Sequence, residues 1–164
     1  MARSESTLKM RLVAGRKAPL FTGKTFDGQS ISLKDYLGRM VALVFYPRDF
    51  TPTCTVEVCN LRDHYTSLKN AGIHLIGISA DDEQSHQRFA VKNALPFPLI
   101  ADTQKKIIGK YGVWAEKQLY GKKYMGIIRT TFLIDKEGKF LHVFEKVQSA
   151  RHAEQLLEFL EKEK

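Results

Sequence analysis

Both cysteines of the chain, Cys54 and Cys59, lie in a segment where the sequence changes from a strand pattern to a helix pattern. The apolar run 40–46 precedes them, and apolar residues at three- and four-residue spacing follow from Val58 onward. Backbone N–H groups in the first turn of a helix lack intrahelical partners and carry the positive end of the helix dipole. A thiol at that position ionises more easily to the nucleophilic thiolate. The segment therefore predicts thiolate chemistry at Cys54.

Thr51 and Pro52 have the residue types expected at the start of this helix. Threonine is a common N-cap, and proline is favoured at the first helical position because its missing N–H is not needed there. The hydroxyl of a capping threonine accepts the N–H three residues on, here that of Cys54, and keeps its own proton. We therefore predict that Thr51 caps the helix and still has an O–H free to donate.

Pro47, Thr51 and Cys54 form the pattern Pro-x-x-x-Thr-x-x-Cys, which resembles the active-site motif of the peroxiredoxins, thiol peroxidases of thioredoxin fold. The second cysteine five positions on resembles the subclass called bacterioferritin comigratory protein, or Q-type peroxiredoxin. Further stretches fall in the family's order, namely 40–46, 73–82, 110–114 and 129–135. The resemblance thus covers most of the chain.

The resemblance implies a role for each matching residue. Cys54 would attack the peroxide, and the Thr51 hydroxyl would orient it together with the Cys54 backbone N–H. Pro47 would shield the thiolate from bulk water. Arg129 would stabilise the thiolate and the negative charge that grows on the peroxide oxygen. Tyr46, the last residue of the strand before the motif, is expected to support the site.

Two charged residues have more than one possible role, and one position departs from the family pattern. Glu57 lies one helical turn from Cys54 and is predicted to hold Arg129 through a bidentate pair. The alternatives are an exposed first-turn glutamate, which the helix dipole favours, and a surface arginine. Thr53 occupies a place where the subclass often has glycine, so its side chain is expected to narrow or redirect access.

Cys59 poses a geometric problem. Five residues along an ideal helix separate two Cα atoms by ~8.7 Å, whereas a disulfide tolerates at most about 7 Å. If Cys59 is the resolving cysteine that the resemblance implies, the first turns of the helix must unwind to bring it to Cys54. An inert helical cysteine is the alternative. A zinc site on Cys54, Cys59 and His64 is weaker, because steps of five scatter ligands around a helix and no fourth ligand is apparent.

The function implied by the resemblance is that of a thiol-dependent peroxidase in antioxidant defence. It would reduce hydrogen peroxide and organic hydroperoxides through a sulfenic acid and an intramolecular disulfide, which thioredoxin or a similar dithiol protein would recycle. The alternative is a thiol–disulfide exchange protein or redox sensor. Exchange centres usually have two residues between their cysteines, whereas this chain has four.

The rest of the chain alternates strand and helix patterns. Strands are expected at 20–26, 29–32, 40–46, 73–79, 98–101, 130–134 and 140–145, with a hairpin turn at 27–28. Helices are expected between Ser32 and Gly38, at 54–70, at 83–93, at 103–111 with Thr103 as its cap, and from about 150. With the resemblance, this alternation predicts an α/β, thioredoxin-like fold with a central mixed sheet, flanking helices and an N-terminal hairpin extension.

Composition favours one domain. The chain has 164 residues, of which 43% are hydrophobic, and no repeat or linker divides it. We expect a single domain over 1–164, with about 1–12 as a loose N-terminal tail. The longest apolar run is far shorter than the ~20 residues of a membrane helix, and the N-terminus lacks a signal core. A cytoplasmic protein without a membrane partner is therefore expected, and the resemblance favours a monomer.

The formal net charge of +8 makes nucleic acid the obvious macromolecular partner to consider. No zinc-finger spacing, basic heptad region or RNA-binding aromatic motif accompanies the charge, and scattered lysines are typical of a solvated surface. Nucleic-acid binding is therefore not expected. The sequence also lacks haem, flavin and phosphate-loop signatures, and its five histidines show no metal-ligand spacing, so we predict neither a cofactor nor a metal.

Overall fold

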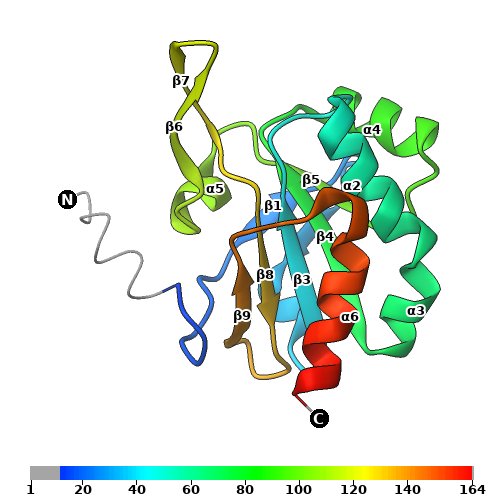
Figure 1. Cartoon of the computed structure of the whole chain (residues 1–164). Helices are drawn as coiled ribbons and strands as arrows, with labels where there is room; N and C mark the ends of the chain where they lie inside the picture. Colours follow the sequence, from blue (N-terminus) through cyan, green and yellow to red (C-terminus); the bar gives the residue numbers. More distant parts are fainter. Residues whose placement is uncertain (1–11, 164) are drawn as a thin grey trace.

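The fold is built around one mixed sheet of five strands (Figure 1), seen in a computed structural model that describes residues 12–163. In spatial order the strands are β5 (Leu99–Ala101), β4 (Ile73–Ser79), β3 (Met40–Phe45), β8 (Thr130–Ile134) and β9 (Phe140–Phe144). The first three run parallel to one another, whereas β8 and β9 are antiparallel to their neighbours. The predicted α/β class with a central mixed sheet is confirmed.

Strand β3 lies in the middle of this sheet and is apolar on both sides. Val41, Leu43 and Phe45 belong to one hydrophobic core, whereas Ala42 and Val44 belong to the other. This division follows from the two-residue period of a strand, since both faces of the sheet are covered. The end of β3, which leads directly to the two cysteines, is therefore held from both sides.

Helices cover the two faces of the sheet. The core that contains Ala42 is closed by α2 (Pro52–Asp63), α3 (Tyr65–Asn70), α4 (Glu83–Lys92) and α6 (His152–Lys162). The opposite core is closed by α5 (Lys106–Lys110) and the short helix η1 (Leu33–Tyr36). A turn of 3-10 helix, η2 (Ser149–Arg151), leads into α6, which lies beside α2 in Figure 1.

The predicted N-terminal hairpin is confirmed. Strands β1 (Thr22–Lys24) and β2 (Ser30–Ser32) pair antiparallel, although both are shorter than the sequence pattern suggested. Helix η1 starts directly after Ser32, whose backbone N–H donates to Asp35 at 3.0 Å. Gly38 follows with a φ of +88°, a conformation that glycine adopts without strain.

A second hairpin was not predicted. Strands β6 (Trp114–Leu119) and β7 (Lys122–Ile127) pair antiparallel and project from the body of the molecule in Figure 1. Tyr120 and Gly121 form the turn, both with positive φ, as two-residue hairpin turns require. Most residues of the hairpin are exposed, so the alternation of apolar and polar residues that marks a half-buried strand is missing.

The helix predicted at 54–70 is wrong as one element, because α2 ends at Asp63 and α3 begins at Tyr65. His64 separates them, with φ −106° and ψ 14°. The Nδ1 atom of its ring lies 2.9 Å from the carbonyl oxygen of Asn60, in the last turn of α2. The apolar spacing continues across the break, which is why the sequence pattern did not show it.

The prediction of Thr103 as a helix cap is also wrong. Helix α5 begins only after Lys105, which has a φ of +59°. The Asp102 carboxylate accepts the backbone N–H groups of Lys106 at 3.1 Å and Ile108 at 2.8 Å. Aspartate thus satisfies the open helix donors, because its two oxygens reach two N–H groups at once.

The expected N-terminal tail at about 1–12 lies outside the described residues except for Leu12, which packs against the core that contains Phe45. Among the described residues, no helix combines the length and the apolar character that a membrane crossing requires.

Candidate active site

Cys54 is the third residue of α2, as the sequence pattern predicted. The helix starts with Thr51 at the N-cap and Pro52 at the first position, and the Cys54 side chain points into the core against the sheet. The residue is fully buried and its thiol is free. The sulfur therefore lies in the first helical turn, where unpaired N–H groups favour an anion.

Arg129 is brought to Cys54 by strand pairing. It directly precedes β8, whose first residue, Thr130, pairs with Phe45 at the end of β3. Its Nη2 donates to Cys54 Sγ at 3.3 Å, and its Nη1 donates to Glu57. Burial acts to lower the pKa of Arg129, but the charges of Glu57 and Cys54 raise it overall. A fixed cation thus touches the candidate nucleophile.

Glu57 lies inside the protein, so the alternative of an exposed first-turn glutamate is wrong. The pairing with Arg129 is present, but it is not bidentate as predicted, because only Oε1 accepts from the guanidinium. The second oxygen, Oε2, is buried without a hydrogen-bond partner among the described residues. Burial raises the pKa of Glu57 to about 7, although Arg129 opposes this shift. The carboxyl is therefore protonated more easily near neutral pH than a solvent-exposed glutamate.

His152 completes this buried group and was missed by the sequence analysis. It opens α6, is fully buried, and has its Nε2 4.0 Å from Glu57 Oε2. The same nitrogen lies 2.7 Å from the Thr131 hydroxyl, and Nδ1 lies 2.8 Å from Gln155 Oε1. Burial lowers the pKa of His152 to about 4, so the ring is neutral at pH 7. No sequence signal separates this histidine from the other four, since its partners come from distant segments.

The predicted N-cap position of Thr51 is confirmed, but the predicted bond of its hydroxyl is wrong. The hydroxyl does not accept the Cys54 N–H. It donates to the Arg48 carbonyl at 2.9 Å, three residues back. The loop before the helix turns so tightly that this carbonyl is the nearer partner. The proton of the Thr51 hydroxyl is therefore engaged in this structure.

A cavity of about 530 Å³ lies beside this loop and reaches Pro47 and Thr51. The β6–β7 hairpin forms much of its wall, and the residues from the hairpin are Trp114, Lys117, Leu119, Tyr124, Met125, Gly126 and Ile127. Aromatic and aliphatic side chains therefore dominate this side. Lys117 donates to the Ile127 carbonyl at 3.0 Å, and burial together with Arg129 lowers its pKa.

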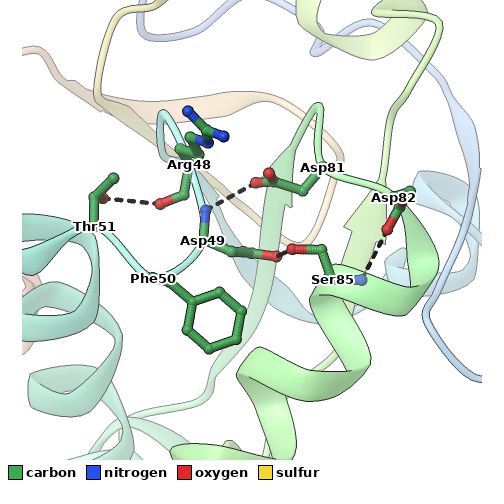
Figure 2. A pocket seen from close by; sticks show the side chains of 7 residues that line it. All are labelled: Arg48, Asp49, Phe50, Thr51, Asp81, Asp82 and Ser85. Carbon is green, nitrogen blue, oxygen red and sulfur yellow. Dashed lines mark hydrogen bonds between the residues drawn. The ribbon is translucent and has the colours of Figure 1, made fainter.

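A second cavity, of about 500 Å³, borders the same loop and is lined by polar groups (Figure 2). Asp81, Asp82 and Ser85 form its wall on the α4 side. Figure 2 shows the Arg48 side chain and the Phe50 ring leaving the loop in opposite directions. Neither cavity has Cys54 in its lining, so a substrate would meet Pro47 and Thr51 first.

Tyr46 is fully buried in the same hydrophobic core as Cys54. Its hydroxyl donates to Asp49 Oδ1 at 2.7 Å. Burial, followed by the charge of Asp49, raises the pKa of Tyr46 well above its usual value, so the phenol stays protonated. Tyr46 therefore supports the loop that precedes α2.

Cys59 lies on the same unbroken helix as Cys54, and both thiols are free. Its Sγ donates to Asn93 Oδ1 at 3.4 Å, which links α2 to the end of α4. Arg62 adds a second link, because its Nη1 donates to the Asn93 carbonyl at 2.8 Å. Cys59 is thus held against the end of α4. It lies on a different side of α2 from the one that contacts Arg129.

The proposed zinc ligands do not meet. Cys54 contacts Arg129, Cys59 contacts Asn93, and His64 lies 3.4 Å from Glu154. Within residues 12–163, another set of metal-ligand types does lie together, with ligand atoms of Asp49, Asp81 and His86 within 4.8 Å of one another. These atoms already bond to protein groups, as described below.

Known proteins resemble this chain over most of its length. A profile of the AhpC/TSA family matches residues 14–143. The putative peroxiredoxin bcp of Coxiella burnetii is 45% identical over 148 residues, which cover 90% of this chain and 98% of that protein. Peroxiredoxin Bcp of Escherichia coli K12 is 42% identical over 149 residues, with 91% and 96% covered.

Solved structures give the same picture. The bacterioferritin comigratory protein of Xanthomonas campestris, studied for alkyl peroxide reduction, superposes with a TM-score of 0.82 at 30% identity and covers 92% of this chain and 98% of its own. The peroxidoxin BcpB of Mycobacterium tuberculosis superposes with a TM-score of 0.81 at 31% identity, with 92% and 97% covered.

Fold and site together define a thioredoxin-like protein with a free cysteine in the first turn of a helix, in contact with an arginine. The chain belongs to the AhpC/TSA family and, within it, to the peroxiredoxins of the Bcp or Q type. It is therefore an oxidoreductase, a thiol-dependent peroxidase, as the resemblance of its motif implied.

Proposed function

We propose that Cys54 is the peroxidatic nucleophile of this enzyme. Its thiolate attacks the terminal oxygen of a hydroperoxide, so that an S–O bond forms and the O–O bond breaks. The leaving oxygen takes up a proton and departs as water or alcohol, and Cys54 becomes a sulfenic acid. The contact that carries this proposal is the one between Arg129 Nη2 and Cys54 Sγ at 3.3 Å, which no structural disulfide or buried inert cysteine needs.

In this proposal Arg129 stabilises charge throughout the reaction. It faces the thiolate at rest and the negative charge that moves onto the peroxide oxygens as the O–O bond breaks. Glu57 holds the guanidinium in place through Oε1. When Glu57 is protonated, the charge of Arg129 is not neutralised by it and acts on the sulfur alone. Pro47 and Thr51 would shield the thiolate and orient the peroxide.

Cys59 is proposed as the resolving cysteine. Its thiol condenses with the Cys54 sulfenic acid, so that a disulfide forms and water is released. Because both residues lie on α2, the helix must unwind between them, and the Cys59–Asn93 contact must break. A dithiol protein of the thioredoxin type then reduces the disulfide and becomes oxidised itself.

Hydrogen peroxide and organic hydroperoxides are the proposed substrates. Support for the organic class comes from the cavity of about 530 Å³, whose hairpin wall is mainly aromatic and aliphatic and meets Pro47 and Thr51. An alkyl chain could lie there while the peroxide group reaches the loop. The Xanthomonas relative was studied for alkyl peroxide reduction, which agrees with this assignment.

We further propose a cytoplasmic monomer. Both cysteines of the mechanism lie on one helix of one chain, so no second subunit is needed to complete it. The recycling step needs a dithiol reductant, which fits a reducing compartment. The alternative of an exchange protein or redox sensor is not favoured by any contact in the described residues.

The experiment uses purified protein with a thioredoxin system and a panel of peroxides. Cys54→Ser should abolish peroxide consumption. Cys59→Ser should consume one equivalent of peroxide and then stop in the presence of thioredoxin. Mass spectrometry of the wild type should show an intramolecular disulfide after one turnover. A Cys54→Ser protein that keeps its turnover would overturn the assignment, and a Cys59→Ser protein with full turnover would remove Cys59 from the mechanism.

A further inference from the structure

The loop 47–51, which connects β3 to α2, contains a residue in an unfavourable backbone conformation. Phe50 has a φ of +66°, in the left-handed region. For a residue with a Cβ atom this costs about 1–2 kcal/mol, and such a conformation persists only where the surroundings impose it. The Phe50 ring packs edge-on against Phe89 with centroids 5.1 Å apart, but it is partly exposed and cannot hold the loop alone.

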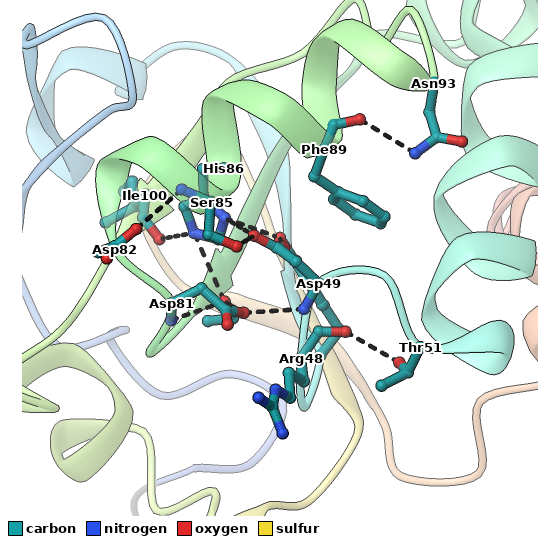
Figure 3. A network of polar contacts seen from close by, with 12 residues as sticks. Arg48, Asp49, Thr51, Asp81, Asp82, Ser85, His86, Phe89, Asn93 and Ile100 are labelled. Carbon is teal, nitrogen blue, oxygen red and sulfur yellow. Dashed lines mark hydrogen bonds and ion pairs between the residues drawn. The ribbon is translucent and has the colours of Figure 1, made fainter.

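Asp49, the preceding residue, fastens the loop to the rest of the molecule (Figure 3). Its Oδ1 accepts the Tyr46 hydroxyl, and its Oδ2 accepts the Ser85 hydroxyl, both at 2.7 Å. Its backbone N–H donates to Asp81 at 2.9 Å. The loop is therefore bound through Asp49 to the residue directly after β3, to the segment that follows β4 and to α4.

The remaining partner of Asp49 is His86, on α4. Its Nδ1 lies 2.7 Å from Asp49 Oδ2, and both side chains are almost completely buried, at 0% and 1% exposure. On the far side of the ring, Nε2 lies 3.0 Å from the Ile100 carbonyl. The ring thus spans the distance between the loop and β5.

This pattern defines the protons of His86. A carbonyl oxygen only accepts, so Nε2 must carry a hydrogen to bond Ile100. Asp49 already accepts two hydroxyl groups, and donors of this kind favour the ionised carboxylate, so Nδ1 carries a hydrogen as well. Each acceptor and donor of the pair is satisfied, which is the condition for burying two charges without a large penalty. With a hydrogen on both nitrogens, the His86 ring offers no lone pair to a metal.

We infer that His86, as an imidazolium paired with Asp49, is a positioning residue for the peroxidase site. It touches neither the thiol nor the cavities, and it acts by holding the loop that carries Pro47 and Thr51 and starts α2. This inference rests on the proposed role of Cys54.

The first test compares two rate constants in His86→Gln, which keeps a donor of similar size but loses the charge. We expect the second-order rate constant with hydrogen peroxide to fall about 10- to 100-fold, because oxygen transfer depends on the geometry of the loop. Alkylation of Cys54 by chloroacetamide needs a thiolate but no oriented peroxide, and it should change less than about twofold. The control is His74→Gln. His74 lies at the end of β4 opposite to the one that leads to α4, so both rate constants of this variant should match those of the wild type. A folded His86→Gln protein with the wild-type peroxide rate overturns the inference, as does an equal loss in both reactions.

The second test needs no substitution. In ¹⁵N-labelled wild-type protein at pH 7, both ring nitrogens of His86 should give nuclear magnetic resonance shifts of protonated nitrogens. One protonated and one bare nitrogen would overturn the inference. If His86→Gln does not fold, Ser85→Ala decides the kinetic question, since it removes one bond of Asp49. A several-fold slower peroxide reaction supports the inference, and an unchanged rate opposes it. A wild type that does not react with peroxide at Cys54 would instead refute the proposed function.

Discussion

Two buried carboxylates flank the start of α2, and their surroundings differ. Asp49 accepts hydrogen bonds from Tyr46 and Ser85 and is paired with His86. Glu57 accepts only from Arg129 and leaves one oxygen without a hydrogen-bond partner among the described residues. Both carboxylates face a cation inside the protein, yet only one of them is fully satisfied.

This difference gives the two pairs different roles. Asp49 and His86 form a structural pair, whereas Glu57 and Arg129 form a responsive pair, in which the carboxyl can exchange a proton. A buried charge with all its partners is fixed, because any change leaves an unsatisfied group in a low-dielectric environment. A buried carboxyl with one partner can exchange a proton near neutral pH, which agrees with the raised pKa of Glu57. The fully bonded pair holds the loop, and the incompletely bonded Glu57 shares the Arg129 guanidinium with the Cys54 sulfur.

The largest effect is expected from Arg129→Ala, which removes the cation from the responsive site. The rate constant with hydrogen peroxide should fall by about 10²–10³-fold, the usual loss when one charge-stabilising donor is removed. Stopped-flow kinetics under excess peroxide would measure it. Arg151→Ala is the matched control, because that arginine is exposed and pairs with Glu158 on the surface. A loss below about fivefold would contradict the role of Arg129.

The next effect tests the structural pair by its stability. Asp49→Asn should lower the free energy of unfolding by about 3 kcal/mol, since it leaves the buried His86 charge without its partner. Glu57→Gln should change it by less than about 1 kcal/mol at pH 7, because burial already favours the neutral carboxyl and the group has one partner. Urea titration at pH 7 measures both. Equal losses for the two variants would remove the distinction drawn here.

A pH series would sharpen the comparison further. The pKa of Glu57 rises from 4.5 to about 7 on folding, so its contribution to stability is complete below pH 4.5 and is lost as the pH rises through 7. The pKa of His152 falls from 6.5 to about 4, so its contribution is complete above pH 6.5 and is lost as the pH falls through 4. Between pH 4.5 and 6.5 the stability contribution of Glu57 therefore falls with rising pH, whereas that of His152 rises.

Single variants should separate these slopes. In His152→Gln, the free energy of unfolding should fall by no more than about 3 kcal/mol as the pH rises from 4.5 to 7. In Glu57→Gln, it should rise by a similar amount as the pH rises from 4 to 6.5. Urea unfolding at half-unit pH steps measures both, with the wild type as reference. A Glu57→Gln protein that still loses stability as the pH rises to 7 would assign the slope to another group.

The smallest effect concerns Cys59. Asn93→Ala removes the acceptor of its thiol and should lower the free energy of unfolding by about 1 kcal/mol, the net value of one hydrogen bond. Disulfide formation after one equivalent of peroxide should become about two- to threefold faster, because the end of α2 opens more easily. Quenched mass spectrometry follows the disulfide, and Asn70→Ala on the exposed end of α3 serves as control. A slower disulfide step would show that Asn93 helps resolution.

The sequence predicted those parts of the site whose residues lie close together in the chain. Pro52 after Thr51 and an apolar helical pattern are enough to place Cys54 in a first helical turn. Arg129 was assigned only because its segment resembles the family, and pairing of Thr130 with Phe45 is what brings it to the thiol. The direction of the Thr51 hydroxyl was predicted wrongly, because it depends on the tight turn of the loop.

Local order and composition therefore decided the strand–helix junction, the N-cap and the position of Cys54 in the helix, since these depend on neighbouring residues and on backbone hydrogen bonding. Only the tertiary structure decided which buried titratable groups lie close to one another. His152 lies close to Glu57 although it is 95 residues further along the chain, and His86 of α4 pairs with Asp49 in the loop between β3 and α2. Desolvation and the number of available donors set these charges, and both arise only when distant segments pack together.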